Sequence, residues 1–152
     1  MRIFRHLISW VLALFLIAMF VQQTIAPLPD PPEGGVLLFD APGHNIVFQT
    51  VAERSGVSLF EPAGRFVIAV VELIAAFFLL WPFSRRFGAT LAVLVCGAAV
   101  ALHLSPWLGR DVPLLLDPSG TATDGGQLFM LSIVMLVASL LIMVVHPGKI
   151  RA

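Results

Sequence analysis

The sequence contains few residues of the kinds that build catalytic or metal centres. Its single cysteine, Cys96, lies inside an apolar run, and one thiol cannot form an internal disulfide, a CxxC redox pair or a cysteine-ligated zinc site. The chain has no Gly-rich phosphate loop, no nucleophile motif and no cluster of metal-ligand residues. The four histidines form no opposed pair that would hold a haem. We therefore expect no catalytic residue and no metal, and the sequence argues against a self-sufficient oxidoreductase.

Charge is also scarce. Only 12% of the 152 residues are charged, against about 25% in an average soluble domain. The formal net charge is zero, so no basic surface indicates a nucleic-acid partner. By contrast, 59% of the residues are hydrophobic. This composition predicts one all-α integral membrane domain over 1–152, with the lipid bilayer as its main partner.

Four apolar runs predict membrane-spanning helices at about 7–26, 63–81, 87–105 and 127–145, each long enough to cross a bilayer. The loops 27–62 and 106–123 then lie on one side. A cleaved signal peptide is the alternative for the first run, but Pro27 follows its only small-residue site, so we expect a retained helix. Residues 45–54 form either a short helix in the membrane interface, ended by Gly56, or a loop without membrane contact.

Charge distribution predicts the orientation of these helices. The side opposite the loops 27–62 and 106–123 holds a cluster of basic residues and no acidic one. An excess of Lys and Arg in short loops marks the cytoplasmic side of a membrane protein. We therefore expect an antiparallel four-helix bundle with both termini in the cytoplasm. The basic residues are Arg2, Arg5, Arg85, Arg86, Lys149 and Arg151.

One carboxylate, Glu72, lies near the middle of the second predicted helix. A charge at that depth costs on the order of 3 kcal/mol on insertion scales, so it normally faces the bundle interior and is a functional candidate. Glu72 either accepts protons or anchors a ligand, or it is a structural carboxyl that fixes helix packing. The face of this helix that carries Glu72 is expected to pack against the other helices, and the opposite face is expected to contact lipid. The first face is Arg65, Ile68, Ala69, Ala75, Ala76 and Leu79; the second is Val67, Val70, Ile74, Phe77 and Phe78.

His103 lies near the end of the third helix, on a stripe of small residues typical of close helix packing. Because helices two and three are expected to be antiparallel neighbours, their side chains lean toward each other. We expect His103 and Glu72 to meet directly or through one water. The alternative for His103 is an interfacial residue with its own hydrogen bonds. The stripe is Gly88, Ala92, Cys96, Ala99 and His103.

Further polar residues are expected at the outer end of the bundle, where they would complete a pocket for a quinone headgroup or a small polar solute. Arg65 has an alternative role, in which its side chain snorkels to the headgroups. Asp124 has an alternative as a solvated loop acid. Ser132 and Ser139 are expected to hydrogen-bond between helices. The candidate pocket is Glu72, His103, Arg65, Gln22, Gln23, Asp124 and Gln127.

Several short motifs resemble the core of the DoxX-like family of small bacterial membrane proteins. They lie within residues 44–145 and begin with Gly64-x7-Glu72 and Phe87-Gly88-Ala89. The later ones are His103-Leu104-x-x-x-Leu108-Gly109 and Asp124-Gly125-Gly126-Gln127-Leu128-Phe129. Many members of this family carry a lysine late in the first helix, where this chain has Gln22 and Gln23.

The resemblance implies a four-helix protein of the bacterial inner membrane. Some members of this family are similar to the small subunits of thiosulfate:quinone oxidoreductase, and most have no assigned reaction. A quinone ligand is implied by this resemblance alone. We therefore expect an accessory or quinone-facing subunit of a membrane redox system, with a redox partner protein or as a homo-oligomer. The alternatives are a small-solute transporter or channel component, with Glu72 as its proton-coupling residue, and a structural assembly factor.

Overall fold

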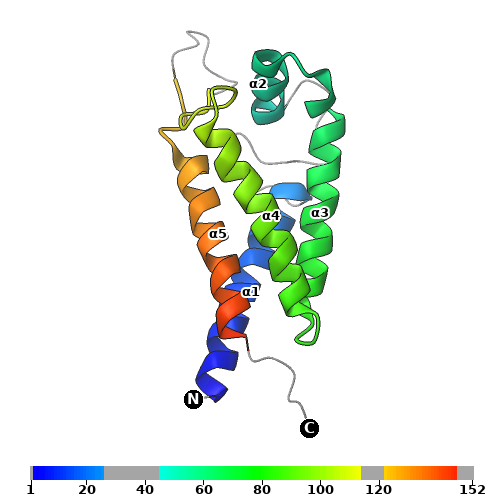
Figure 1. Ribbon diagram of the computed structural model, residues 1–152, viewed down its shortest axis with the longest axis vertical. Coiled ribbons are helices and arrows are strands. Elements are labelled where there is room, and N and C mark those ends of the chain that lie inside the picture. Colours follow the sequence, from blue (N-terminus) through cyan, green and yellow to red (C-terminus); the bar gives the residue numbers. More distant parts are fainter. Residues whose placement is uncertain (1, 26–44, 114–121, 147–152) are drawn as a thin grey trace.

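The computed structural model describes residues 2–25, 45–113 and 122–146, and these ranges are mainly helical (Figure 1). Four of the helices are long and apolar enough to cross a membrane, namely α1, α3, α4 and α5. The all-α class and the four membrane-length helices are therefore confirmed. The elements are α1 (Arg2–Thr24), α2 (Ile46–Ser55), the 3-10 helix η1 (Ser58–Phe60), α3 (Ala63–Leu80), α4 (Arg85–Leu104) and α5 (Gln127–Val145).

The helix limits lie close to those expected, and the differences have local causes. α5 matches the predicted range 127–145. α3 ends one residue early because Trp81 is extended, with φ −96° and ψ 122°, as expected for a residue before a proline. α4 begins at Arg85 instead of 87, and α1 covers Arg2–Thr24 instead of 7–26. Residues 26–44 and 114–121 of the two predicted loops lie outside the described ranges.

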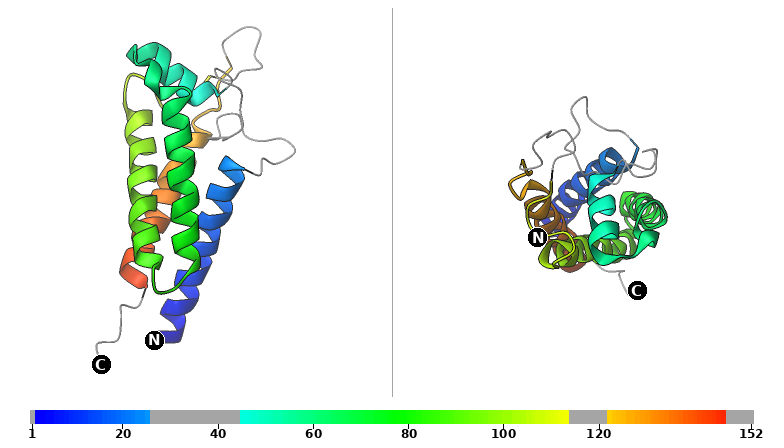
Figure 2. Two further views of the ribbon diagram at one scale, coloured as in Figure 1. Left: turned by 90° about the vertical axis from the view of Figure 1, so that its right-hand side faces the viewer. Right: turned by 90° about the horizontal axis from the view of Figure 1, so that it is seen from above.

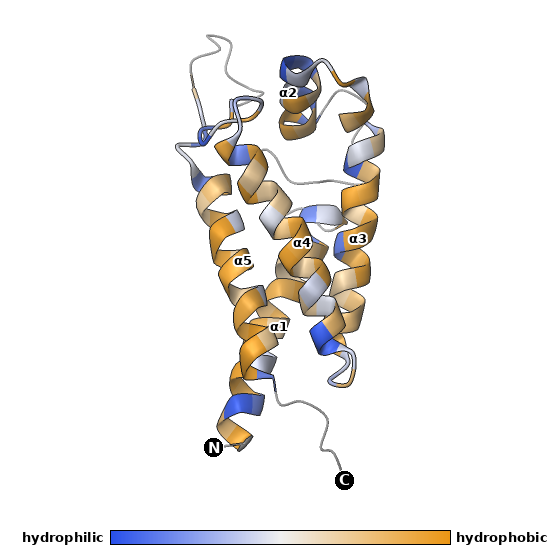
Figure 3. Ribbon diagram, in the orientation of Figure 1, coloured by the Kyte–Doolittle hydropathy of each residue, from blue (hydrophilic) through white to orange (hydrophobic). Residues whose placement is uncertain are grey.

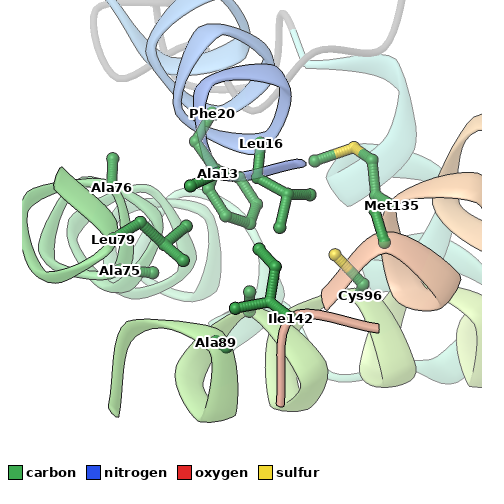
Figure 4. Packing of buried hydrophobic residues seen from close by; sticks show 12 residues of the cluster. Ala13, Leu16, Phe20, Ala75, Ala76, Leu79, Ala89, Cys96, Met135 and Ile142 are labelled. Carbon is green, nitrogen blue, oxygen red and sulfur yellow. The ribbon is translucent and has the colours of Figure 1, made fainter. Parts of the chain in front are cut away.

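The long helices enclose one apolar core, to which all four contribute (Figure 4). Phe20 of α1, Leu79 of α3 and Ile142 of α5 are completely buried in it. Hydrophobic residues also continue over the outer surfaces of these helices (Figure 3). The two faces predicted for α3 differ in burial as expected, except that Ile68 and Phe78 are both half-buried. Its buried residues are Arg65, Ala69, Glu72, Ala75, Ala76 and Leu79, and Val67, Val70, Ile74 and Phe77 are exposed.

α3 and α4 approach each other closely at Gly88. A Cβ atom built on Gly88 would lie 2.6 Å from the backbone nitrogen of Leu79 and 2.9 Å from the carbonyl oxygen of Ala75. Real Cβ atoms essentially never come so close, so only glycine permits this contact. Further along the same stripe, Ala92 and Cys96 are buried. The predicted small-residue stripe is therefore a packing surface, as is common between membrane helices.

α2 lies at one end of the bundle, beside the start of α3 and the end of α4 (Figure 2). Asn45 caps it by accepting a hydrogen bond from the Phe48 amide at 3.2 Å, and Gly56 ends it with a left-handed φ of 73°. Val51 of α2 packs on Leu108 and Val112. That this segment forms a helix is thus confirmed, and its position in the membrane interface stays a prediction. We call this the α2 end of the bundle.

Candidate binding cavity

A cavity of about 710 Å³ lies in the half of the bundle toward the α2 end. Its walls come from all four long helices and from α2, through residues such as Phe20, Phe48 and Met135. Nearly all of the lining is apolar. Five polar side chains interrupt it, and they are Gln23, Glu72, His103, Ser105 and Ser132.

The cavity reaches the outer surface of the bundle between α3 and α4. Val67 of α3 lines the cavity and is also 61% exposed. Ala98 and Ala101 of α4 line it and are exposed as well. These residues lie on membrane-length helices, so the opening faces the region that lipid would occupy.

Glu72 is the most unusual polar residue of the cavity lining. It lies in the middle of α3 and is only 4% exposed. Its Oε2 atom is buried and has no hydrogen-bond partner within the described ranges. Buried polar groups are nearly always hydrogen-bonded, and an orphaned one calls for an explanation such as an absent ligand, ion or water. Glu72 is thus a candidate ligand-binding group.

His103 presents a second polar group to the same cavity. Its Nδ1 atom lies 2.9 Å from the carbonyl oxygen of Gly109, so Nδ1–H donates, since a carbonyl can only accept. Nε2 of the neutral ring is then an acceptor, and it has no partner among the described residues. The ring also contacts Phe129, with centroids 5.6 Å apart. Backbone and aromatic contacts therefore fix the ring and leave one nitrogen for a ligand.

The structure brings Glu72 and His103 to one cavity, but it does not join them directly. Of the two expected contacts, the direct hydrogen bond is not formed: His103 Nδ1 bonds to Gly109, and Glu72 Oε2 has no partner among the described residues. The chain turn after α4 supplies an acceptor closer to the ring, which helix geometry alone could not indicate. The bridging water remains a prediction.

Arg65 belongs to a different contact. Its side chain is fully buried instead of snorkelling, and its Nε and Nη2 atoms each lie 3.0 Å from a carboxylate oxygen of Glu61. Glu61 is an extended residue between η1 and Pro62, with φ −128° and ψ 125°. The pair therefore joins the segment before α3 to the first turn of that helix. Arg65 is not part of the cavity lining.

The other residues predicted to line the pocket also fall into two groups, those that line the cavity and those that do not. Gln23 lines the cavity, whereas Gln22 and Gln127 do not, and Gln127 is exposed. Asp124 caps the start of α5, because its carboxylate accepts hydrogen bonds from the amides of Val112, Gly126 and Leu128 at 2.8–3.0 Å. Asp124 is therefore a loop-ordering residue, neither a pocket residue nor a purely solvated acid.

The serines of α5 bond within their own helix. Ser132 Oγ donates to the Phe129 carbonyl at 2.8 Å and Ser139 Oγ to the Leu136 carbonyl at 2.7 Å. The expected interhelical bonds are therefore wrong, because a helical serine can satisfy itself on the preceding turn. Sequence reasoning also missed Phe48 as a wall of the cavity. Its spacing of three from Val51 placed both on one face of α2.

Among residues 2–25, 45–113 and 122–146, no group of three or more His, Cys, Asp and Glu side chains is placed to hold a metal ion. No family model, curated protein or solved structure matches the chain. The function must therefore be argued from the cavity and its residues.

Proposed function

We propose that the cavity binds a quinone or a closely similar lipophilic molecule with a small polar headgroup. We further propose that the chain is a DoxX-like accessory subunit of a redox system in the bacterial inner membrane. In this proposal its four long helices are antiparallel and both termini are cytoplasmic. The observation that carries it is the orphaned carboxylate oxygen of Glu72 in an otherwise apolar cavity.

The cavity has the properties that such a ligand requires. Its volume of about 710 Å³ falls in the range of roughly 300–1,000 Å³ that is usual for small-molecule sites. The opening between α3 and α4 lets a membrane-dissolved molecule enter without crossing water. Apolar walls suit a ring and an isoprenoid tail, and the few polar groups fix the orientation of the head.

The two polar residues match the two forms of the headgroup. A carboxyl donates a hydrogen bond when protonated and accepts one when ionised, so Glu72 suits either a carbonyl or a hydroxyl. His103 Nε2 in the neutral ring accepts from a hydroxyl. The chain has one cysteine, and the proposal assigns the electron-donating centre to a partner protein.

Ligand binding can be measured by quenching of tryptophan fluorescence, because Trp107 lines the cavity. We expect a short-chain quinone to quench the reconstituted protein in a saturable way. Ala99→Phe fills the cavity and should weaken binding by about tenfold or more, since each lost 1.4 kcal/mol is tenfold. Ala18→Phe is the matched control, because Ala18 is exposed on α1. Equal binding by both variants would contradict the proposed site.

The subunit assignment has a separate test, a pull-down in mild detergent followed by mass spectrometry. Co-purification of a dehydrogenase or a sulfur-oxidising enzyme, lost on competition with untagged chain, would support it. A homo-oligomer without an oxidoreductase that drives proton-coupled solute uptake in vesicles would contradict it and favour the transporter alternative.

A further inference from the structure

The end of the bundle opposite α2 gathers cationic side chains around the last turn of α5. Arg5 donates to the carbonyl oxygens of Val145 and Val144 at 3.0 and 3.2 Å. Arg86 donates to the carbonyl oxygen of His146 at 3.0 Å. Two guanidinium groups from different helices thus converge on three successive carbonyls. We call Arg5, Arg85, Arg86 and His146 the basic end.

Arg85 lies behind these two groups and is completely buried. Its Nε donates to the Leu79 carbonyl at 2.9 Å and its Nη1 to Ser9 Oγ at 3.2 Å. The guanidinium also stacks on Trp10, at 3.9 Å from the ring centroid. Its Nη2 atom is buried and has no hydrogen-bond partner within the described ranges.

No carboxylate side chain belongs to the sequence ranges that form this end. The sequence contains no Asp or Glu in residues 1–29, 73–110 or 125–152, which include all of α1, α4 and α5. Helix C-terminal carbonyls supply only partial negative charge. A buried charge without a counter-ion is costly, so an anion from outside the chain would stabilise this arrangement.

We propose that the basic end binds the phosphate group of an anionic phospholipid. Arginine is suited to this role, because its planar guanidinium presents donors in a geometry that matches phosphate oxygens. Basic sites between membrane helices are typical binding places for such headgroups. The same phosphate chemistry would also admit free phosphate. Large apolar side chains that are exposed at this end would contact acyl chains, and this favours the lipid; they are Phe4, Leu7, Phe83 and Phe87.

The test compares three ligands on the delipidated full chain: phosphatidylglycerol, phosphatidylcholine and inorganic phosphate. Native mass spectrometry measures retained lipid, and thermal unfolding in detergent measures protection. We expect phosphatidylglycerol to bind at least tenfold more tightly than phosphatidylcholine and to raise the unfolding temperature. Inorganic phosphate should give no protection at the same concentration.

Variants locate the site. Arg5→Gln/Arg86→Gln should reduce phosphatidylglycerol binding to the level of phosphatidylcholine, and Arg86→Gln alone should reduce it partly if the double variant does not fold. The matched control is Arg54→Gln/Arg110→Gln, because both arginines are exposed at the α2 end, and Arg54 also donates to a carbonyl. Unchanged selectivity in the first pair, or equal loss in the control, overturns the site. Equal protection by inorganic phosphate overturns the assignment to lipid.

Discussion

At the scale of single residues, Glu72 and Arg85 share one property. Each is buried, each carries an ionisable group, and each has one polar atom without a partner among the described residues. Such atoms cost about 1–3 kcal/mol each. Arg85 is otherwise held by a carbonyl, a hydroxyl and an aromatic ring. Glu72 has no comparable structural contact, so we infer that its carboxyl is retained for a ligand.

The first prediction concerns the stability of Glu72 variants. If the Glu72 carboxyl were structural, its replacement by leucine would leave a hydrogen-bond partner unpaired, but Glu72 Oε2 has no such partner among the described residues. Glu72→Leu should therefore unfold at the same temperature as the unchanged protein or higher, with a gain of up to about 1–3 kcal/mol. The same variant should lose quinone binding. Thermal unfolding in detergent measures the first effect, and a marked loss of stability would restore the structural interpretation of Glu72.

His146, outside the membrane-length helices, makes a directed chain of hydrogen bonds. Its Nε2–H donates to the Pro82 carbonyl at 2.8 Å, so its Nδ1 accepts from the Ser9 hydroxyl at 2.9 Å. Burial lowers the pKa of His146, and the nearby charges of Arg85, Arg86 and His6 act in the same direction, against the bond to Pro82. A neutral ring therefore fits the contacts on both of its nitrogens.

The second prediction is a pH dependence that follows from this ring. Below the ordinary histidine pKa of 6.5, the unfolded chain binds a proton that the folded chain does not. The free energy of unfolding should therefore fall as the pH drops below about 6.5. His146→Gln should remove this part of the slope. His6→Gln should reduce it less, because His6 is exposed and acts on His146 only through its charge. Unfolding curves between pH 5 and 8 measure it; identical slopes in the two variants would contradict the assignment.

At the scale of elements, the contact between α3 and α4 decides where the cavity can exist. Near Gly88 the two helices meet backbone to backbone. Toward the α2 end, Glu72, Ala99 and His103 all line open space instead. The same two helices therefore pack tightly at Gly88 and line the cavity toward the α2 end.

The third prediction tests the tight contact. Gly88→Ala places a methyl group against the backbone of α3 and should destabilise the protein by about 1–3 kcal/mol, the usual cost of overpacking. Gly97→Ala is the control on the same helix, because a Cβ there meets nothing within 4 Å. It should be neutral or stabilising by up to about 1 kcal/mol, since alanine favours helix. Equal effects would contradict the close approach.

Much of this architecture could be predicted from the helical periodicity of hydrophobic residues and from the residues that begin and end helices. The small and bulky residues of α3 divide as its two faces do, and Pro82 and Asn45 mark helix limits that the structure shares. Side-chain partners could not be predicted in the same way. His103 bonds to Gly109, and Asp124 bonds three amides, because loop conformation, which no periodicity encodes, brings those groups near.

The residues that line the cavity could be predicted only in part, for the same reason. Glu72, His103 and Gln23 line the cavity as the sequence predicts. Arg65, Asp124, Gln22 and Gln127 also belong to the outer end of the bundle in the sequence prediction, but they do not line the cavity. Each of the first two has a local partner within four residues that competes for it. Gln127 is exposed. The position of a residue along its helix thus limits which residues can line the cavity, and the packing of the whole bundle decides which of them do.

At the scale of the whole molecule, the two ends of the bundle differ in their content of carboxylates. Carboxylates such as Glu61, Asp111 and Asp124 belong to the α2 end, and the basic end holds none from the sequence ranges that form it. The fourth prediction is that the basic end is cytoplasmic. Alkaline phosphatase fused after Ala152 should be inactive, and a green fluorescent protein at the same position should be fluorescent. The reverse pattern would contradict the orientation.

The central claim is that a lipophilic ligand occupies the cavity with its headgroup near Glu72. Photolabelling with an azidoquinone in reconstituted membranes, followed by peptide mapping, tests it most directly. The account predicts labels on residues of α3 around Glu72 and on 95–103 of α4, removed by excess unlabelled quinone and by Ala99→Phe. Labels that are spread over the exposed residues Val70, Ile74 and Phe77, and that excess unlabelled quinone does not remove, would contradict it.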